Sequence, residues 1–405
     1  MIIIQKQIKM LIAERQKSII DRYFTVEFVQ IKSNPRFTEP IVHVNWDYIY
    51  SIPEFGVLQT LHQSPKWHSE SVYVSGHVNS VIQKAVDYFE SRIMDKFNKD
   101  DIILMMAAIF HDIGKATTTF LKEQDGLWHH YGHEIESEKI TRRILWELGP
   151  NLREPICQLV RWHMEPLNVI RSKKPVEKMI DLSYKVPSIN LLYHLKKFDM
   201  LGSKAMDPEL TKYDFEILDA FSALANTLGC RYYPSDVNRI TRTVNDMVTK
   251  KPNITVELYM GLPGAGKDTA IYNEPDIDHN KVVVCRDDIR IDLGFCKAGE
   301  KYLGTTDEEN QVTKEFNKRM KDAAAAGKTI ILNNMNNKRK YRDDYKNILR
   351  DYNVHWIYVY VEADSLQKNI DRRNGQIPAH VFPKLMENFE FPTIDEYEHL
   401  EIIIT

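Results

Sequence analysis

The sequence has few cysteines, and their spacing supports no paired chemistry. Four occur among the 405 residues, Cys157, Cys230, Cys285 and Cys296, and none belongs to a CxxC motif. Disulfide frameworks and structural zinc–thiolate sites need closely spaced cysteines. The cysteine content therefore argues against both and indicates a reducing compartment, so we expect a cytoplasmic protein.

Long apolar runs and a strong net charge are also missing. No segment approaches the roughly 18 consecutive apolar residues that a membrane-spanning helix needs, so we expect no membrane contact. The opening residues, MIIIQKQIKM, lack the longer apolar core of a signal peptide. The net charge is −3, so a nucleic-acid substrate would have to be held by a local basic surface.

The remaining composition, 43% apolar and 27% charged, is ordinary for a globular protein. Residues 1 to about 250 carry apolar side chains at intervals of three and four, which predicts helices. From Ile254 onward, short β-branched runs alternate with helical stretches, which predicts a parallel sheet with crossover helices. We therefore predict a multi-domain chain: a helical or irregular extension over 1–55, an all-α domain over 56–248 and an α/β domain over 252–405.

A glycine-rich loop follows the first predicted strand of the α/β domain. The strand ITVELYM leads directly into GLPGAGKDT and then into a helical run. In this context glycines let backbone N–H groups turn toward a phosphate, and the lysine reaches the terminal phosphates of a nucleotide. We predict a site for ATP or another nucleoside triphosphate with Mg²⁺. Its residues are Gly261, Pro263, Gly264, Ala265, Gly266, Lys267, Asp268 and Thr269.

Asp268 departs from the usual pattern, because a serine or threonine hydroxyl normally stands at this position of the loop. A carboxylate is a competent ligand for Mg²⁺, although it adds negative charge beside the triphosphate. Thr269 keeps a hydroxyl nearby. The GKDT motif also resembles a variant found in some nucleotide-monophosphate kinases, so we expect phosphate binding to be retained.

Charged residues follow the second predicted strand, where VVVC runs into RDDIR. Side chains at the carboxyl ends of parallel strands face the ligand crevice. A carboxylate there can accept the proton of an attacking hydroxyl, and an arginine three residues later can clamp a phosphate of the acceptor. From about Ile254 on, the phosphate loop followed by RDDIR resembles the 5′-hydroxyl polynucleotide kinases of bacteriophages and of bacterial RNA-repair enzymes.

The resemblance implies roles for single residues. Asp287 would be the general base, Arg290 would bind a phosphate of the acceptor strand, and Lys267 would stabilise the phosphoryl group in transfer. The lid segment NIDRRNGQIP offers Arg372 and Arg373, and which of them reaches the phosphates stays open.

One departure from that family lies at the end of the third predicted strand, ILNNMNN. The family tends to have Asp-x-Asn there, and Asn334 and Asn336 occupy these positions. An amide is a weaker partner for Mg²⁺ than a carboxylate and cannot act as a base, so Asp268 would supply the missing charge.

Histidines and aspartates recur near the ends of predicted helices in the first 250 residues. They stand in the motifs SGHVNS, FHDIGK, GHEIES, LVRWHM and LKKFDMLGS. Side chains from several helices can converge on one point, and imidazoles with carboxylates suit a divalent metal. Such an ion lowers the pKa of a bound water and polarises a phosphoryl oxygen. The candidate ligands are His77, His111, Asp112, His133, His163 and Asp199.

Their order resembles the HD phosphohydrolase superfamily, specifically the HD domain attached to tRNA nucleotidyltransferases. The resemblance implies a divalent metal of the Mn, Ni, Co, Mg or Zn type, with His133 and His163 at a second metal or the phosphate and Lys115 neutralising phosphate charge. The stretch HSES departs from that subgroup's usual Glu-Gly and leaves the role of His68 open. The metal core would be formed by His77, His111, Asp112 and Asp199.

Together, the two motif sets resemble bacterial RNA end-healing enzymes of the HD-Pnk type. In such enzymes one domain phosphorylates a 5′-hydroxyl end with ATP, and the other removes a 2′,3′-cyclic or terminal 2′/3′ phosphate. The resemblance implies RNA or other polynucleotide ends as partners, with an RNA ligase acting afterwards. It also implies the cytoplasm of a bacterial cell, or of a host if a phage encodes the protein.

Two alternatives stay open. An HD nucleotidase joined to a nucleoside or nucleotide kinase would act on mononucleotides, which the GKDT motif favours. A decayed kinase domain that only senses nucleotide would suit the changes at Asp268 and Asn334.

Overall fold

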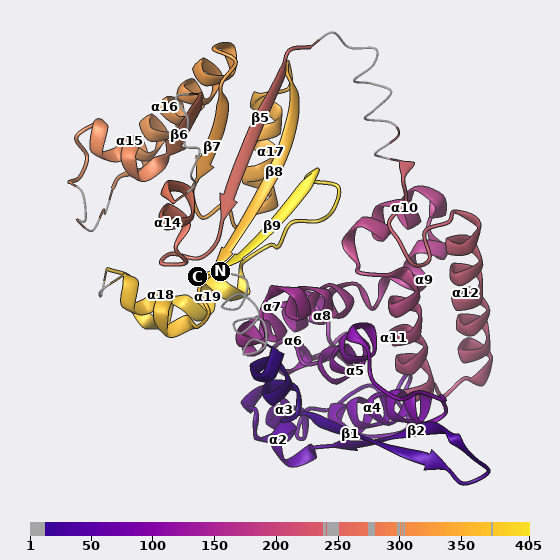
Figure 1. The fold of residues 1–405 in the computed structure, drawn as a ribbon. Coiled ribbons are helices and arrows are strands. Elements are labelled where there is room, and N and C mark those ends of the chain that lie inside the picture. The colour runs from indigo at the N-terminus through magenta and orange to yellow at the C-terminus, as the bar shows by residue number, and fades with distance from the viewer. Residues whose placement is uncertain are drawn as a thin grey trace. The chain divides into compact units, whose positions relative to one another are not determined.

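The structure is a computed structural model, and it describes residues 13–237, 240, 251–273, 280–297, 300, 302, 304–373 and 376–405. The chain divides into two compact units, Met1–Ser235 and Asp236–Thr405. In Figure 1 the first unit runs from indigo to magenta and the second from orange to yellow. We predicted that the first domain ends at 248 and the second begins at 252; residues 241–250 lie outside the described residues. Among the described residues, we find no helix whose length and apolar character would let it span a bilayer.

The first unit is mainly helical, as predicted, and is built around α5 (Lys99–Phe110). All residues from Ile103 to Phe110 are buried, and a helix that is apolar on every side must lie inside its domain. It packs against α4 (Val74–Glu90), α8 (Pro150–Trp162) and α11 (Ile189–Gly202). The other elements are a helix over 13–20, α2 (Trp46–Ser51), α3 (Pro53–Leu58), α6 (Lys115–Thr118), α7 (His133–Ile144), η1 (Trp146–Leu148), α9 (Glu165–Arg171), α10 (Pro175–Lys185) and α12 (Pro208–Thr227).

Two antiparallel hairpins interrupt this unit. β1 (Phe24–Ile31) pairs with β2 (Asn34–Val44), which corrects the expectation of a helical or irregular extension over 1–55. In FTVEF, apolar residues alternate with exposed Thr25 and Glu27, and this period of two is typical of a half-buried strand. The shorter hairpin joins β3 (Phe120–Lys122) to β4 (Leu127–His129) between α6 and α7.

The second unit contains a five-stranded sheet in the order β6-β7-β5-β8-β9, and all neighbouring strands are parallel. The predicted parallel sheet with crossover helices is confirmed. The strands are β5 (Asn253–Met260), β6 (Lys281–Cys285), β7 (Thr329–Asn333), β8 (Asn353–Glu362) and β9 (His399–Ile404). The helices are α14 (Lys267–Tyr272), α15 (Arg286–Asp292), α16 (Thr306–Ala325), α17 (Arg339–Ile348), α18 (Leu366–Arg372), η2 (Ala379–Val381) and α19 (Phe382–Glu387).

The strand order decides where a ligand can bind in this unit. β7, the third strand of this unit, lies between β5 and β6, so the first two strands of the unit are not neighbours. Because the strands are parallel, the segments that follow β5, β6 and β7 emerge at the same edge of the sheet, where ligands bind in folds of this type. The phosphate loop, the RDDIR motif and the asparagine-rich segment therefore share one edge (Figure 1).

Candidate active sites

The predicted metal ligands of the first unit come from five helices that meet inside it. They are His77 in α4, His111 and Asp112 after α5, His133 at the start of α7, His163 after α8 and Asp199 in α11. All are buried except His133, which is partly buried. The structure thus brings together all six residues that the sequence singled out.

Asp112 lies at the centre of this cluster. Its Oδ2 atom is 3.4 Å from Nε2 of His77 and 3.3 Å from Nε2 of His111. Its Oδ1 atom is 3.2 Å from Nε2 of His133 and 3.9 Å from Nε2 of His163. Asp199 closes the first group, with Oδ1 at 3.1 Å from Nε2 of His77. Each oxygen of the Asp112 carboxylate therefore faces its own pair of imidazoles.

Three of the four rings are oriented by backbone carbonyls. Nδ1 of His111 is 2.9 Å from the carbonyl oxygen of Ala108, and Nδ1 of His163 is 2.7 Å from that of Val160. Both histidines cap the ends of helices, where the last carbonyls lack partners within the helix. Nδ1 of His133 is likewise 2.8 Å from the carbonyl oxygen of His130. A carbonyl can only accept, so each Nδ1 carries the hydrogen and each Nε2 is left for a metal.

The electrostatics of the cluster fit a divalent cation. Burial raises the pKa of Asp112, but Lys115 and His111 lower it well below its usual value, so the carboxylate stays ionised. Burial and the neighbouring His133 lower the pKa of His163 to about 3, which keeps that ring neutral. Nε2 of His111 is buried and has no hydrogen-bond partner among the described residues. Bare imidazole nitrogens facing carboxylate oxygens repel each other unless a cation lies between them, and this donor set suits transition metals.

Two groups within the cluster have ligand atoms within 4.8 Å of one another, and each could hold an ion. They are His77, His111 and Asp199, and Asp112, His133 and His163. The resemblance implied that Asp112 belongs with His77 and His111. In the structure this carboxylate also faces the second group through its other oxygen, an arrangement suited to two neighbouring ions.

Two buried lysines hold the carboxylates of the cluster. Nζ of Lys115 is 2.6 Å from Oδ2 of Asp112, and Nζ of Lys196 is 2.6 Å from Oδ2 of Asp199. We expected Lys115 to neutralise phosphate, and here its charge is balanced by Asp112. Lys196 was not predicted, although its position three residues before Asp199 on a helix is a spacing that brings side chains together.

In the second unit, the phosphate loop closes against α18. Gly264 and Gly266 have φ angles of 74° and 94°, which favour glycine. A Cβ atom on Gly264 would lie 2.4 Å from the carbonyl oxygen of Asn369, so a larger residue would clash with α18. Six of the eight predicted loop residues line a groove on this unit, and Gly261 and Ala265 do not. The six are Pro263, Gly264, Gly266, Lys267, Asp268 and Thr269.

Lys267 folds back onto its own loop. Its Nζ donates hydrogen bonds of 3.0 Å and 3.2 Å to the carbonyl oxygens of Gly261 and Leu262. Burial lowers the pKa of Lys267 to about 8, although the neighbouring Asp268 opposes the shift. The ammonium group is therefore held beside the loop by weak acceptors, which the phosphates of a nucleotide can replace.

Asp268 reaches the end of β7. Its Oδ1 accepts a hydrogen bond of 2.7 Å from Nδ2 of Asn333. The carboxylate of Asp268 thus lies at the end of β7, where Asn334 follows the strand. This is the position expected if Asp268 supplies the charge that Asn334 lacks. Asn333 itself was not predicted.

The two asparagines that we singled out have different surroundings. Nδ2 of Asn334 is buried and has no hydrogen-bond partner among the described residues, while its Oδ1 accepts from the backbone N–H of Arg286. Asn336 is buried, and its Nδ2 donates to the carbonyl oxygens of Tyr259 and Leu332. Asn336 therefore ties β5 to β7.

A groove of about 1770 Å³ connects the phosphate loop to the RDDIR motif and extends between α16 and α17. Asp287 and Arg290 both line it, from the first turns of α15. Arg290 is held between two carboxylates, because it pairs with Asp287 and its Nε donates to Oε1 of Glu309 at 2.8 Å. Hydrogen bonding from Arg290 lowers the pKa of Glu309 to about 2. Glu309, on α16, was not predicted.

Two family models match the chain. Residues 77–224 match the HD domain, and residues 256–392 match an AAA domain. The chain joins an HD phosphohydrolase domain to a P-loop kinase-like domain. The matched ranges contain every site residue predicted for each domain.

The two arginines predicted for the lid of the kinase-like domain are not equivalent. Arg372 donates from Nη1 to the carbonyl oxygen of Gly264 and to the hydroxyl of Thr405. Arg373 lines the groove, and its Nε is buried with no hydrogen-bond partner among the described residues. Arg372 is therefore tied to the phosphate loop, whereas Arg373 keeps a buried donor without a partner among the described residues.

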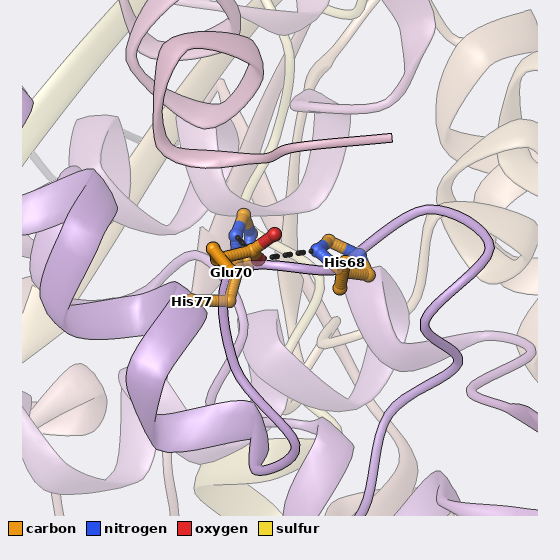
Figure 2. Close-up of side chains that lie close together, drawn as sticks. All are labelled: His68, Glu70 and His77. Atoms are coloured by element: carbon orange, nitrogen blue, oxygen red, sulfur yellow. Dashed lines mark hydrogen bonds and ion pairs between the residues drawn. The ribbon is translucent and has the colours of Figure 1, made fainter. Parts of the chain in front are cut away.

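In the HD domain, two further polar residues stand next to His77. His68 and Glu70 lie in the loop before α4, and Nδ1 of His77 is 3.4 Å from Oε1 of Glu70 (Figure 2). Both residues precede the range that matches the HD domain. The spacing His-x-Glu was visible in HSES, but no periodicity indicated that this loop returns to the cluster.

Proposed function

We propose that this protein heals broken RNA ends, phosphorylating 5′-hydroxyl ends with ATP in its kinase-like domain and removing 2′,3′-cyclic or terminal 2′/3′ phosphates in its HD domain. The products would be the 5′-phosphate and 3′-hydroxyl ends that an RNA ligase joins. The observation that carries the proposal is the groove that holds Lys267, Asp287 and Arg290 together, on a chain that also carries the HD cluster.

The kinase step follows from the positions of three side chains. The carboxylate of Asp287 accepts the proton of the 5′-hydroxyl, whose oxygen attacks the γ-phosphorus of ATP. The bond from that phosphorus to the β–γ bridging oxygen breaks, and ADP leaves. Lys267 and Arg373 donate to the transferred phosphoryl group, which gains most from fixed cationic donors. Mg²⁺, when bound, neutralises phosphate charge, and Asp268 is the residue that would hold it.

The size of the groove favours a polymeric acceptor. Pockets for small molecules usually enclose about 300–1,000 Å³, and this groove encloses about 1770 Å³. It continues from the phosphate loop along α16 and α17 as far as Ala325 and Ile348. That length leaves room for nucleotides beyond the one that is phosphorylated. Arg290, beside Asp287, supports the binding of an acceptor phosphate.

The HD step follows from the buried cluster. When bound, a divalent ion supplies a water of lowered pKa and polarises a phosphoryl oxygen. Nε2 atoms of His77, His111, His133 and His163, with Asp112 and Asp199, would hold the ion or ions. Lys115 pairs with Asp112, and its remaining N–H donors are the ones it would offer to the phosphate oxygens. Addition of water to phosphorus and departure of O2′ or O3′ opens a cyclic phosphate, and a second hydrolysis releases inorganic phosphate.

A second candidate is an HD nucleotidase joined to a mononucleotide kinase. The observation that favours it is Asp268 in GKDT, which the hydrogen bond to Asn333 keeps at the loop. It predicts that free nucleosides or nucleotides are phosphorylated at lower concentrations than oligonucleotides.

The discriminating experiment offers one RNA with a 5′-hydroxyl and a 2′,3′-cyclic phosphate to the purified protein with γ-labelled ATP and Mn²⁺ or Mg²⁺. We expect label at the 5′ end and loss of the cyclic end. Competing nucleosides measure the preference for a polymer. Absence of both reactions on RNA, with turnover of mononucleotides, would overturn the proposal in favour of the second candidate. Tight ATP binding without any turnover would indicate a nucleotide sensor.

A further inference from the structure

His77 differs from the other three imidazoles of the HD cluster in how its ring is oriented. His111, His133 and His163 each direct Nδ1 at a backbone carbonyl three residues earlier. His77 is the fourth residue of α4, where backbone carbonyls are used by the helix itself. Its orientation therefore has to come from side chains outside the helix.

The carboxylate of Glu70 and the hydroxyl of Ser203 lie next to Nδ1 of His77. Nδ1 of His77 is 3.4 Å from Oε1 of Glu70 and 3.5 Å from Oγ of Ser203. The Ser203 hydroxyl donates its hydrogen to the carbonyl oxygen of Asp199 at 2.8 Å, so toward His77 it can only accept. A carboxylate also only accepts. Both neighbours favour a hydrogen on Nδ1 of His77. Nε2 faces the carboxylates of Asp112 and Asp199 at 3.4 Å and 3.1 Å, so it is the nitrogen that an ion held by these carboxylates would meet.

Glu70 is itself held rigidly. Its Oε2 accepts the backbone N–H of Lys204 at 2.8 Å, and its Oε1 accepts Nδ1 of His68 at 2.9 Å. Lys204 follows α11, the helix that carries Asp199, so the same contact fixes the loop before α4 to the end of α11. The Glu70 side chain is only 9% exposed. Figure 2 shows its carboxylate against the rings of His68 and His77.

We propose that Glu70 is a positioning residue of the HD centre, which fixes His77 as the Nδ1–H tautomer and presents its Nε2 to the metal. His68 shares the carboxylate and holds Glu70 in place. This inference rests on the proposed metal centre of the HD domain. Carboxylates that orient metal-bound histidines in this way typically change metal affinity by about 10- to 100-fold when they are removed.

Another use of the same residues is a metal site of its own, because ligand atoms of His68, Glu70 and His77 lie within 4.8 Å of one another. Such an ion would need Nδ1 of His77. A neutral imidazole has one lone pair on nitrogen, so His77 would then lose Nε2 as a ligand of the HD centre. The geometry points to positioning, and a separate ion becomes an outcome of the test.

The test measures Mn²⁺ binding to the full chain by calorimetry, in the absence of any nucleic acid. We expect Glu70→Ala to weaken binding by about 10- to 100-fold without changing the number of ions bound. Glu70→Gln should lie between this variant and the wild type, because the amide oxygen can still accept from one ring. The matched control is Glu134→Ala, since Oε2 of Glu134 is 3.7 Å from Nδ1 of His133 while a carbonyl already orients that ring. We expect less than about a twofold change for the control.

A second readout separates positioning from a purely structural role. Long-range ¹H–¹⁵N spectra of histidine-labelled, Zn²⁺-loaded protein report which nitrogen of His77 carries the hydrogen and which binds the ion, with His77→Gln assigning the signal. We expect the Nδ1–H form in the wild type and a mixture in Glu70→Ala. If Glu70→Ala does not fold, Glu70→Gln carries both measurements.

Each outcome decides between defined possibilities. Unchanged affinity and tautomer in the Glu70 variants would overturn the inference, and so would the loss of one whole equivalent of Mn²⁺ with the rest bound normally, since that result identifies a separate ion site. A wild-type protein that binds no Mn²⁺, Ni²⁺ or Zn²⁺ would instead contradict the metal centre of the proposed function.

Discussion

The two sites differ in how completely their side chains are arranged before a ligand binds. In the HD domain the candidate metal ligands come from five helices, nearly all are buried, and three rings are anchored to backbone carbonyls. In the kinase-like domain the side chain of Asp287 is 74% exposed, and Arg290 and Lys267 bond to the protein's own carboxylates and carbonyls. A buried cluster can receive its ligand with little rearrangement, whereas the open groove must exchange internal contacts for contacts with substrate.

The largest expected effect tests whether the two sites are independent. Asp112→Asn should lower phosphate removal by about a thousand-fold, because several kcal/mol of charge stabilisation are lost with the metal. Lys267→Ala should lower 5′ phosphorylation by about a hundred- to a thousand-fold. Each variant should leave the other reaction within about twofold of the wild type, as measured on one RNA substrate. Loss of both reactions in either variant would show that the sites are coupled.

A smaller effect separates Arg372 from Arg373, the two arginines predicted for the lid. Arg373→Ala should reduce kcat of the kinase reaction by about a hundred-fold, because this arginine lines the groove and its buried Nε has no partner among the described residues, so we expect it to donate to the transferred phosphoryl group. Arg372→Ala is the matched control, since Arg372 already bonds to Gly264 and Thr405. Its kcat should change by less than about fivefold. Equal losses in both variants, from steady-state kinetics, would contradict the assignment.

The pH dependence of ATP binding should show whether Lys267, in the open groove of the kinase-like domain, has to be protonated when phosphates bind. The pKa of Lys267 is lowered from its ordinary value to about 8. Below pH 8 the lysine is charged in the free protein, and above it the proton must be taken up when phosphates bind. The Kd for ATP should therefore be flat below pH 8 and rise by up to about tenfold per unit above it. Calorimetry in buffers of different ionisation enthalpy would measure the proton uptake, and a flat profile to pH 9.5 would contradict the prediction.

The smallest effect concerns the stability of the HD domain. Metal at ten times its Kd should stabilise the folded state by about 1.4 kcal/mol, which corresponds to a few degrees in Tm. Far-UV circular dichroism should not change when EDTA removes the metal, because the cluster lies within a packed core. Asp112→Asn should abolish the shift in Tm. An HD domain that unfolds without metal would contradict the view that the site is assembled in advance.

The sequence was most informative where a single local rule governs both structure and chemistry. Gly264, Gly266 and Lys267 belong to one continuous loop, so their order along the chain already specifies a phosphate site. The FHDIGK motif at the end of an apolar helix likewise indicated His111 and Asp112. The exposed positions Thr25 and Glu27 carried a strand signal that the surrounding helical pattern concealed, which is why the hairpin of β1 and β2 was missed.

Partners that are distant along the chain could not be predicted in the same way. Glu309 lies 19 residues beyond Arg290, and nothing in the spacing shows which charged residue of α16 will face it. Lys204 bonds to Glu70 across 134 residues. Such pairs depend on how helices pack, because packing selects one face of each helix and hides the others.

The sequence alone determined the two kinds of domain and the residue types that each site contains, because apolar periodicity and loop motifs are local properties of the chain. Only the tertiary structure decided which oxygen of Asp112 faces which imidazole, that Arg372 is tied to the phosphate loop while Arg373 is not, and that Glu70 reaches His77. The physical reason is that hydrogen-bond partners are fixed by distance and direction in space, and these are set when separate elements pack against one another.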